Sequence, residues 1–470
     1  MFDDAMAGPP AHVSDLPVWQ RLGLGVLAEY VPTEVIDDVL AQTGRVQERI
    51  RRLPARVSVL FILGLSLFSG MGYRGVWREL THCGGVAAGP APSSSALTRA
   101  RRRVGVAPLR ELFARVRGPR AGQASAGAFL AGLRLVSWDG TQLDVAASPA
   151  NDAVFVPARS RKGGVAAFGK VRLMTLIEVG THAIVDAVFG TESEQVLAAR
   201  LAPALTAGML LLGDRNFPSW KLWAHCAERG GHLLWRVKAS RLLPRLGTFT
   251  DGSWLAVLPK PGTRGTLGCY VRVIEYTVAV TATDPHTGAV TVRTELFRLL
   301  TTITDPHLAD AAQLAACYRQ RWESENGYQE LKTLQRGPRT VLRSTDPDGV
   351  YQELYAYLIT YQAIRTLMVA AADAEGVDPD RLSFTTTIRA VRRWITIPAT
   401  ASAAVLATAI AATLTEIGQD RHQRRNRSGP RAVKRSQASY PAKRHAAQQT
   451  FTTVDYHITL VPDPASCDNA

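Results

Sequence analysis

Residues 130–240 alternate strand-like and helix-like segments in a fixed order, and this order constrains the fold more than any other feature. Arg134–Val145 alternates side chains with the period of a strand, and Met209–Leu212 is a short, wholly apolar strand. The remaining predicted segments are a hairpin (Lys170–Val179 and His182–Phe189), two helices (Glu192–Leu205 and Phe217–Arg229) and a strand (His232–Val237). The order is therefore β-β-β-α-β-α-β, typical of a mixed α/β domain.

Two aspartates occupy special places in this order. Asp139 lies on the first predicted strand, and Asp214 comes directly after the fourth. Each has an ordinary interpretation, because Asp139 precedes Gly140 and suits a turn, whereas Asp214 suits the N-cap of the next helix. One lies on a predicted strand and the other directly after one, and both are candidates for a site that binds cations.

A third candidate acid lies in a helix predicted over Leu308–Leu334. At 100° per residue, four of its side chains fall within a sector of about 60°. They are Tyr318, Arg321, Glu325 and Lys332. One face would then present a carboxylate beside an aromatic hydroxyl and two cations, which suits a metal ion and phosphate oxygens. The ordinary interpretation is an exposed glutamate paired with Arg321 or Lys332.

Three motifs resemble those of the insertion-sequence-four family of bacterial DDE transposases, and the resemblance covers most of residues 130–370. They are Ser137-Trp138-Asp139-Gly140-Thr141, Leu212-Gly213-Asp214-Arg215-Asn216-Phe217, and the spacing Y-x-x-R-x-x-x-E-x-x-x-x-x-x-K that starts at Tyr318. The resemblance implies a ribonuclease-H-like catalytic core, a mixed sheet with flanking helices, interrupted by a β-rich insertion. It also implies DNA cleavage through a hairpin intermediate, with Tyr318, Arg321 and Lys332 holding the terminal DNA.

The chemistry expected of such a site needs few protein groups. Two Mg²⁺ ions, which Mn²⁺ can replace, activate the nucleophile and stabilise the leaving oxygen. Asp139, Asp214 and Glu325 are the predicted metal ligands, because Mg²⁺ takes only a few protein oxygens. Three nearby acids compete with them: Asp144, Glu323 and Glu330. From strand and helix periodicity, we expect the side chains of these three acids to point away from the predicted site.

The net charge and the absence of certain motifs restrict the classes of binding partner that we expect. A formal net charge of +15 over 470 residues favours DNA, RNA or an anionic membrane as partner. No phosphate-binding loop for a nucleotide cofactor is present, and the apolar run Val57–Phe68 is too short to span a bilayer. Five scattered cysteines and the absence of a signal peptide at Met1 predict a cytoplasmic, nucleoid-associated protein.

Basic segments near both ends are candidates for DNA contact. Ser93–Arg103 resembles a recognition helix, with Arg99, Arg101 and Arg102 as the predicted contacts; the alternative is a solvated basic helix. Arg421–Arg444 carries nine Lys and Arg and no acid, including Arg424 and Arg425, and otherwise serves as a solubilising tail. Trp254 is a candidate for stacking on a flipped base, with core packing as its alternative.

We therefore predict a cut-and-paste DNA transposase that acts as a homodimer on the terminal inverted repeats of its own element and joins them to target DNA. Two alternatives stay open: a metal-dependent nuclease of the same fold without strand transfer, and a catalytically silent DNA-binding protein. The predicted segments are a helical N-terminal domain (1–120), the first part of the core (121–240), a β-rich insertion (241–303), the second part of the core (304–375), and a helical C-terminal region with a basic tail (376–470).

Overall fold

The chain forms two compact units that interleave along the sequence. The computed structural model describes residues 22–47, 53–82, 91–158, 164–262, 268–283, 288–321, 327–337, 340–398, 401–421, 427–428 and 452–461. Unit 1 combines residues 1–129, 137–204 and 322–422, and unit 2 combines 130–136, 205–321 and 423–470. Each unit thus gathers distant parts of the chain, and the boundaries of the five predicted segments stay predictions.

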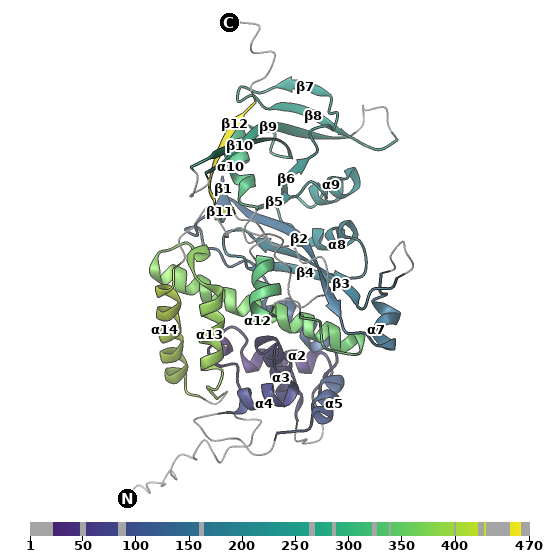
Figure 1. Ribbon diagram of the computed structural model, residues 1–470, viewed down its shortest axis with the longest axis vertical. Coiled ribbons are helices and arrows are strands. Elements are labelled where there is room, and N and C mark those ends of the chain that lie inside the picture. The colour runs from purple at the N-terminus through teal and green to yellow at the C-terminus, as the bar shows by residue number, and fades with distance from the viewer. Residues whose placement is uncertain are drawn as a thin grey trace, which may run out of the picture. The chain divides into compact units, whose positions relative to one another are not determined.

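The helices of unit 1 enclose a core around one long helix, α12 (Pro347–Glu375). The other helices are α2 (Thr33–Gln42), α3 (Ala55–Leu67), α4 (Tyr73–Thr81), α5 (Ser94–Val104), α6 (Ala107–Val116), α13 (Phe384–Trp394) and α14 (Ala403–Gln419). Helix α12 packs against α3, α6, α13 and α14 (Figure 1). The apolar run Val57–Phe68 is confirmed as a buried helix, because α3 exposes little beyond Arg56. No helix among the described residues is both long enough and apolar enough to cross a bilayer.

Three neighbouring strands extend through unit 1, and the first of them carries the candidate acid Asp139. They are β2 (Leu133–Val145), which enters from unit 2, β3 (Gly169–Glu178) and β4 (Ile184–Gly190), in the order β2-β3-β4. Strands β3 and β4 form the predicted antiparallel hairpin, with Thr175 opposite Ala187. Helix α7 (Pro149–Val154) connects β2 to β3, and α8 (Glu194–Leu201) packs against β3 and β4.

Unit 2 is rich in strands, as predicted for the insertion. Its strands are β5 (Met209–Gly213), β6 (His232–Val237), β7 (Arg245–Thr248), β8 (Trp254–Pro259), β9 (Gly268–Thr283), β10 (Val290–Thr301), β11 (Arg427–Ser428) and β12 (Thr452–Leu460). Their order is β11-β12-β9-β10-β6-β5, with β8 also on β9 and β7 on β8. Strands β5 and β6 run parallel, so their carboxyl ends lie at the same edge. Helix α9 (Trp220–Ala227) packs on β6.

The predicted order β-β-β-α-β-α-β is confirmed, with α7 as an addition, and so is the mixed α/β fold class of a ribonuclease-H-like core. The prediction of one helix over Leu308–Leu334 is wrong. A capping box between Asp310 and Gln313 starts α10 at Ala311, and α10 ends at Arg319. A π-helix, η4 (Glu330–Gln335), follows later. The ideal-helix face calculated for Tyr318, Arg321 and Lys332 therefore does not apply.

The C-terminal region contains a strand that the prediction of helices followed by a basic tail did not include, while most of Arg421–Arg444 lies outside the described residues. Helices α13 and α14 confirm the helical part, but Thr452–Leu460 forms β12 and pairs antiparallel with β9. Val454, Tyr456, Ile458 and Leu460 alternate with other residues at the period of a strand. This periodic signal was present in the sequence, and β9 provides the edge that completes its hydrogen bonds.

Candidate active site

Asp139 lies midway along β2, where unit 1 surrounds it with polar groups. Its side chain is half-buried, and Oδ1 accepts a hydrogen bond from the Gly140 N–H at 2.7 Å. A Cβ atom at residue 140 would lie 3.1 Å from Glu194 Oε1, so glycine allows the first turn of α8 to approach Asp139 closely. The Tyr328 hydroxyl donates to the main-chain oxygen of Asp139.

Lys332 places a cation in the field of the same acid. It lies in η4, exposed to solvent. Partial desolvation and then the neighbouring Arg336 lower the pKa of Lys332, while Asp139 and Asp144 raise it in opposition. Lys332 therefore interacts electrostatically with Asp139, the first candidate acid, within unit 1. Its predicted contact with phosphate stays a prediction.

Asp214 directly follows β5 in unit 2. Its Oδ1 accepts from the Arg215 N–H at 2.7 Å, and its main-chain oxygen accepts from the Phe217 N–H at 3.1 Å, which forms a turn. Gly213 is required before it, because a Cβ atom there would lie 2.7 Å from the Trp235 ring. The turn therefore leaves the Asp214 side chain half-buried at the carboxyl end of a parallel strand.

A basic pocket adjoins Asp214, and the sequence reasoning missed it. It has a volume of about 280 Å³, and its lining residues are Arg215, Pro218, Val237, Lys238, Ser240 and Arg241. Arg241 donates to the Pro218 carbonyl at 3.3 Å and accepts at its own carbonyl from Arg298 at 2.6 Å, so its position is fixed. The available signal was that Lys238 and Arg241 follow β6, the strand paired parallel with β5. Polar residues after adjacent parallel strands meet at one edge.

Tyr318 is a packing residue in this structure. It is 4% exposed, and its hydroxyl donates to the Gly213 carbonyl at 3.1 Å, next to Asp214. Burial raises the pKa of the Tyr318 phenol. Arg321 is also buried, with its guanidinium 6.0 Å from the centre of the Tyr318 ring. Both side chains are thus largely buried, and the phosphate contacts predicted for Tyr318 and Arg321 stay predictions.

Trp254, the predicted base-stacking residue, is also buried. It lies in β8, is 7% exposed, and packs under the Arg245 guanidinium at 4.5 Å from its ring centre. This environment favours the core-packing alternative, and the base-stacking role stays a prediction.

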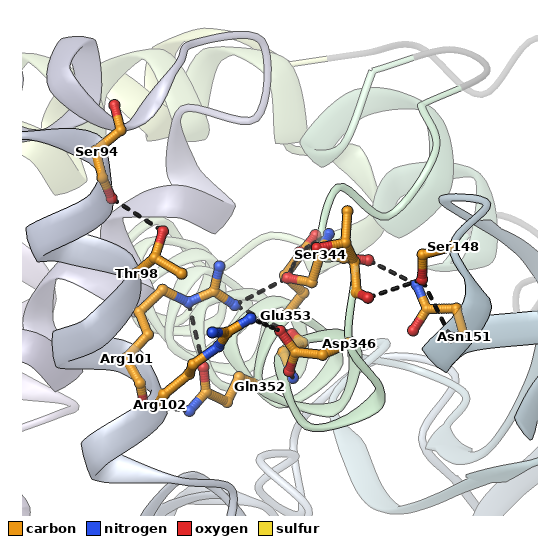
Figure 2. A network of polar contacts seen from close by, with 12 residues as sticks. Ser94, Thr98, Arg101, Arg102, Ser148, Asn151, Ser344, Asp346, Gln352 and Glu353 are labelled. Carbon is orange, nitrogen blue, oxygen red and sulfur yellow. Dashed lines mark hydrogen bonds and ion pairs between the residues drawn. The ribbon is translucent and has the colours of Figure 1, made fainter.

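Arg101 is likewise a structural residue. It is 4% exposed, and its donors reach Gln352 Oε1 at 3.2 Å and Ser344 Oγ at 3.1 Å (Figure 2). It also donates to the Gly349 carbonyl at 3.1 Å and to the Tyr73 hydroxyl. Its hydrogen bonds connect α5 to the start of α12. Internal hydrogen bonds occupy its guanidinium in this structure, and the DNA contact predicted for Arg101 stays a prediction.

The exposed face of α5 carries two of the three arginines that were predicted to contact DNA. Ser93 caps the helix by accepting from the Ala96 N–H at 3.2 Å. Arg99 and Arg102 are exposed, and Arg102 has only a loose ion pair with Asp346 at 3.5 Å. Arg102 also lies at a cavity of about 630 Å³ between α5 and the start of α12. The DNA contacts predicted for Arg99 and Arg102 stay predictions.

A buried ionic cluster lies behind η4. Glu330 accepts from the Tyr361 hydroxyl at 2.8 Å, and its carboxylate lies 3.3 Å from Arg365 and 3.6 Å from His182. Asp380 approaches His182 at 3.2 Å from the opposite side. The cluster joins η4 to α12 and to the β3–β4 turn. It also explains why Glu330 does not compete as a metal ligand, since its oxygens are bound to protein groups.

The residues available for metal binding are carboxylates, as Mg²⁺ prefers. Glu325 lies outside the described residues, as do Arg424 and Arg425. Asp139 belongs to unit 1 and Asp214 to unit 2. Among the described residues, no group of three or more metal-binding side chains is already gathered. The donor type of both aspartates fits a hard divalent cation, and each carboxylate is oriented by the N–H of the residue after it.

Comparisons with known proteins agree with these features. The family model described as insertion element 4 transposase N-terminal matches residues 21–114, and the transposase DDE domain model matches residues 144–362, which include Asp214 and Glu325 but begin after Asp139. The transposase InsG for insertion sequence element IS4 of Escherichia coli (strain K12) is 28% identical over 438 residues, covering 90% of this chain and 94% of that protein. The putative transposase InsZ of the same organism is 27% identical over 228 residues, covering 48% of this chain and 75% of that protein.

Proposed function

Because the chain belongs to the IS4 family of DDE transposases, we propose that it cuts the terminal inverted repeats of its own element and joins them to target DNA. The observation that carries this proposal is the placement of Asp139 and Asp214. Each acid lies on or directly after a strand of the core, and each has its carboxylate held by the following N–H. A basic pocket suited to phosphate adjoins Asp214.

In this proposal Asp139, Asp214 and Glu325 hold two Mg²⁺ ions, and Mn²⁺ can replace them. When bound, the metals supply Lewis-acid stabilisation of the attacking and leaving oxygens. Lys332 and the cations of the basic pocket attract the phosphodiester and offset its charge. The proposed route includes a hairpin intermediate and a homodimer, since two ends must be cut in concert.

The proposed function is tested by incubating the full chain and Mg²⁺ with a labelled duplex that carries the element's ends. We expect end-specific nicking, hairpin formation, and transfer of a pre-cut 3′-OH end into target DNA. Cleavage without transfer would instead establish the nuclease alternative. Binding without cleavage would establish the silent DNA-binding alternative, which the presence of all three acids argues against.

We also propose that the exposed face of α5 binds DNA phosphates through Arg99 and Arg102. Replacing both with alanine should weaken binding to terminal and unrelated duplexes alike. It should also reduce the slope of log affinity against log salt by about 2, because each phosphate contact contributes about one unit. Thermal stability should stay unchanged, since both side chains are exposed. Binding is measured by fluorescence anisotropy over a salt series.

The matched control for this measurement is Arg56→Ala combined with Arg393→Ala, which removes the same charge from unit 1. Both of these arginines are partly exposed and paired with acids, Asp37 and Glu416. The control variant should retain the wild-type salt slope. An equal loss in both variants would attribute the effect to net charge and remove α5 from the DNA interface.

A further inference from the structure

Tyr328 forms a buried hydrogen-bond junction next to Asp139. Its side chain is 7% exposed, and its hydroxyl accepts from the Thr175 N–H at 3.1 Å and lies 2.6 Å from Thr175 Oγ1. The same hydroxyl donates to the main-chain oxygen of Asp139. One phenol therefore contacts two adjacent strands, β2 and β3, at the position of the first candidate acid.

The surroundings of Tyr328 keep this junction fixed. Burial, with smaller contributions from Asp139 and Glu194, raises the pKa of the phenol, so it stays a proton donor at neutral pH. The chain beside it also packs closely. A Cβ atom at Gly327 would lie 3.3 Å from the Tyr361 hydroxyl and 3.5 Å from Ile177 Cδ1. The segment that begins at Gly327 therefore has little freedom to move relative to β3 and α12.

Tyr328 also lies close in sequence to the third candidate acid, three residues after Glu325. Its hydrogen bond to Asp139 thus ties the segment that follows Glu325 to the strand that carries Asp139. The Asp139 side chain has a second restraint, because Oδ1 accepts from the Gly140 N–H at 2.7 Å. Groups that orient metal ligands from behind normally affect metal affinity as well as rate.

We propose that Tyr328 is a positioning residue, whose hydroxyl holds the strand that carries Asp139 in the arrangement that binds the divalent metal. This inference rests on the proposed function, because it assumes that Asp139 is a metal ligand. Tyr328 itself contacts neither substrate nor metal in this proposal. Its removal should therefore change metal affinity before it changes DNA affinity.

The test compares the full-length wild type with Tyr328→Phe, which removes one oxygen atom. Mn²⁺ binding is measured by the electron paramagnetic resonance signal of free Mn²⁺, with and without a pre-cut terminal duplex. We expect Mn²⁺ affinity to fall about 10- to 100-fold, DNA affinity to stay unchanged, and raised Mn²⁺ to restore part of the cleavage. Thr175→Val removes the side-chain hydroxyl that contacts the phenol, and it should also lower Mn²⁺ affinity. This variant takes the place of Tyr328→Phe if Tyr328→Phe does not fold.

The matched control is Tyr357→Phe, because Tyr357 is also buried in unit 1 but faces Arg336. This variant should bind Mn²⁺ as the wild type does. Wild-type Mn²⁺ affinity in Tyr328→Phe, or equal losses in Tyr328→Phe and Tyr357→Phe, would overturn the positioning role while leaving the proposed function intact. A wild type that neither binds Mn²⁺ nor cleaves terminal DNA would overturn the proposed function, and this inference with it.

Discussion

Replacement of Asp139 or Asp214 with asparagine is expected to reduce cleavage of terminal DNA by about 1,000-fold or more, because each change removes an anionic metal ligand. Folding should persist, since both side chains are only half-buried and asparagine keeps their shape. The main-chain N–H of the following residue can still donate to the asparagine oxygen. Single-turnover cleavage with saturating protein and Mg²⁺ separates this loss from any change in DNA binding.

Asp144→Asn is the control for this loss, because Asp144 lies on the same strand and is about half-exposed. Its carboxylate lies 3.8 Å from Lys170. We expect cleavage close to wild type in this variant. Glu325→Ala should behave like the changes at Asp139 and Asp214. If Glu325→Ala cleaves as well as the wild type, the third ligand has been assigned to the wrong carboxylate, and Glu323 becomes the next to test.

The second large effect concerns stability. Glu330→Gln should lower the free energy of unfolding by about 3–5 kcal/mol, because it removes the anion from a buried ionic cluster and leaves Arg365 with less compensation. Arg365 is 1% exposed and also donates to the Thr181 carbonyl at 2.7 Å, so it cannot move into solvent. Urea denaturation monitored by circular dichroism measures the change.

Glu375→Gln provides the comparison, because it removes a partly exposed partner of Arg421 from the same unit. Exposed pairs contribute about 1 kcal/mol or less, so this variant should unfold close to wild type. Equal and small losses in the two variants would mean that the cluster around Glu330 does not stabilise the fold.

The contribution of Glu330 should also depend on pH. Burial alone would raise the pKa of Glu330, but Arg365 and His182 outweigh burial and hold the pKa below its ordinary value of 4.5. A carboxylate with a lowered pKa in the folded state stabilises fully above its unfolded pKa and loses this effect as pH falls through its folded pKa. The difference between wild type and Glu330→Gln should therefore be largest near neutral pH and shrink below about pH 4.5.

Local patterns were enough to predict most of the elements. The alternation in Arg134–Val145 and the apolar run Met209–Leu212 each correspond to a strand, and the predicted helix in Ser93–Arg103 corresponds to α5, which Ser93 caps. Strand periodicity and helix capping depend on residues close in sequence, so one chain displays them directly. The predicted helix boundaries were less accurate. The predicted helix began at Leu308, but the capping box of Asp310 starts α10 at Ala311.

Contacts between distant segments decided which basic and aromatic residues face solvent. Arg101 and Arg102 are neighbours in sequence, yet Arg101 is bonded to residues of α12 and Arg102 is exposed. Tyr318 has the spacing of a phosphate-binding residue, but its hydroxyl bonds to Gly213. A charge or a hydroxyl can satisfy its hydrogen bonds either inside the protein or on a ligand. Only packing determines which of these occurs.

The sequence by itself determined the order of the core elements, the three candidate acids and the excess of positive charge. The tertiary structure alone revealed the basic pocket after β5 and β6, the Glu330 cluster and the contact of Tyr328 with Asp139. Each of these joins residues far apart along the chain. Their hydrogen bonds and ion pairs need distances of a few ångströms, which sequence spacing does not specify and the packing of strands and helices sets.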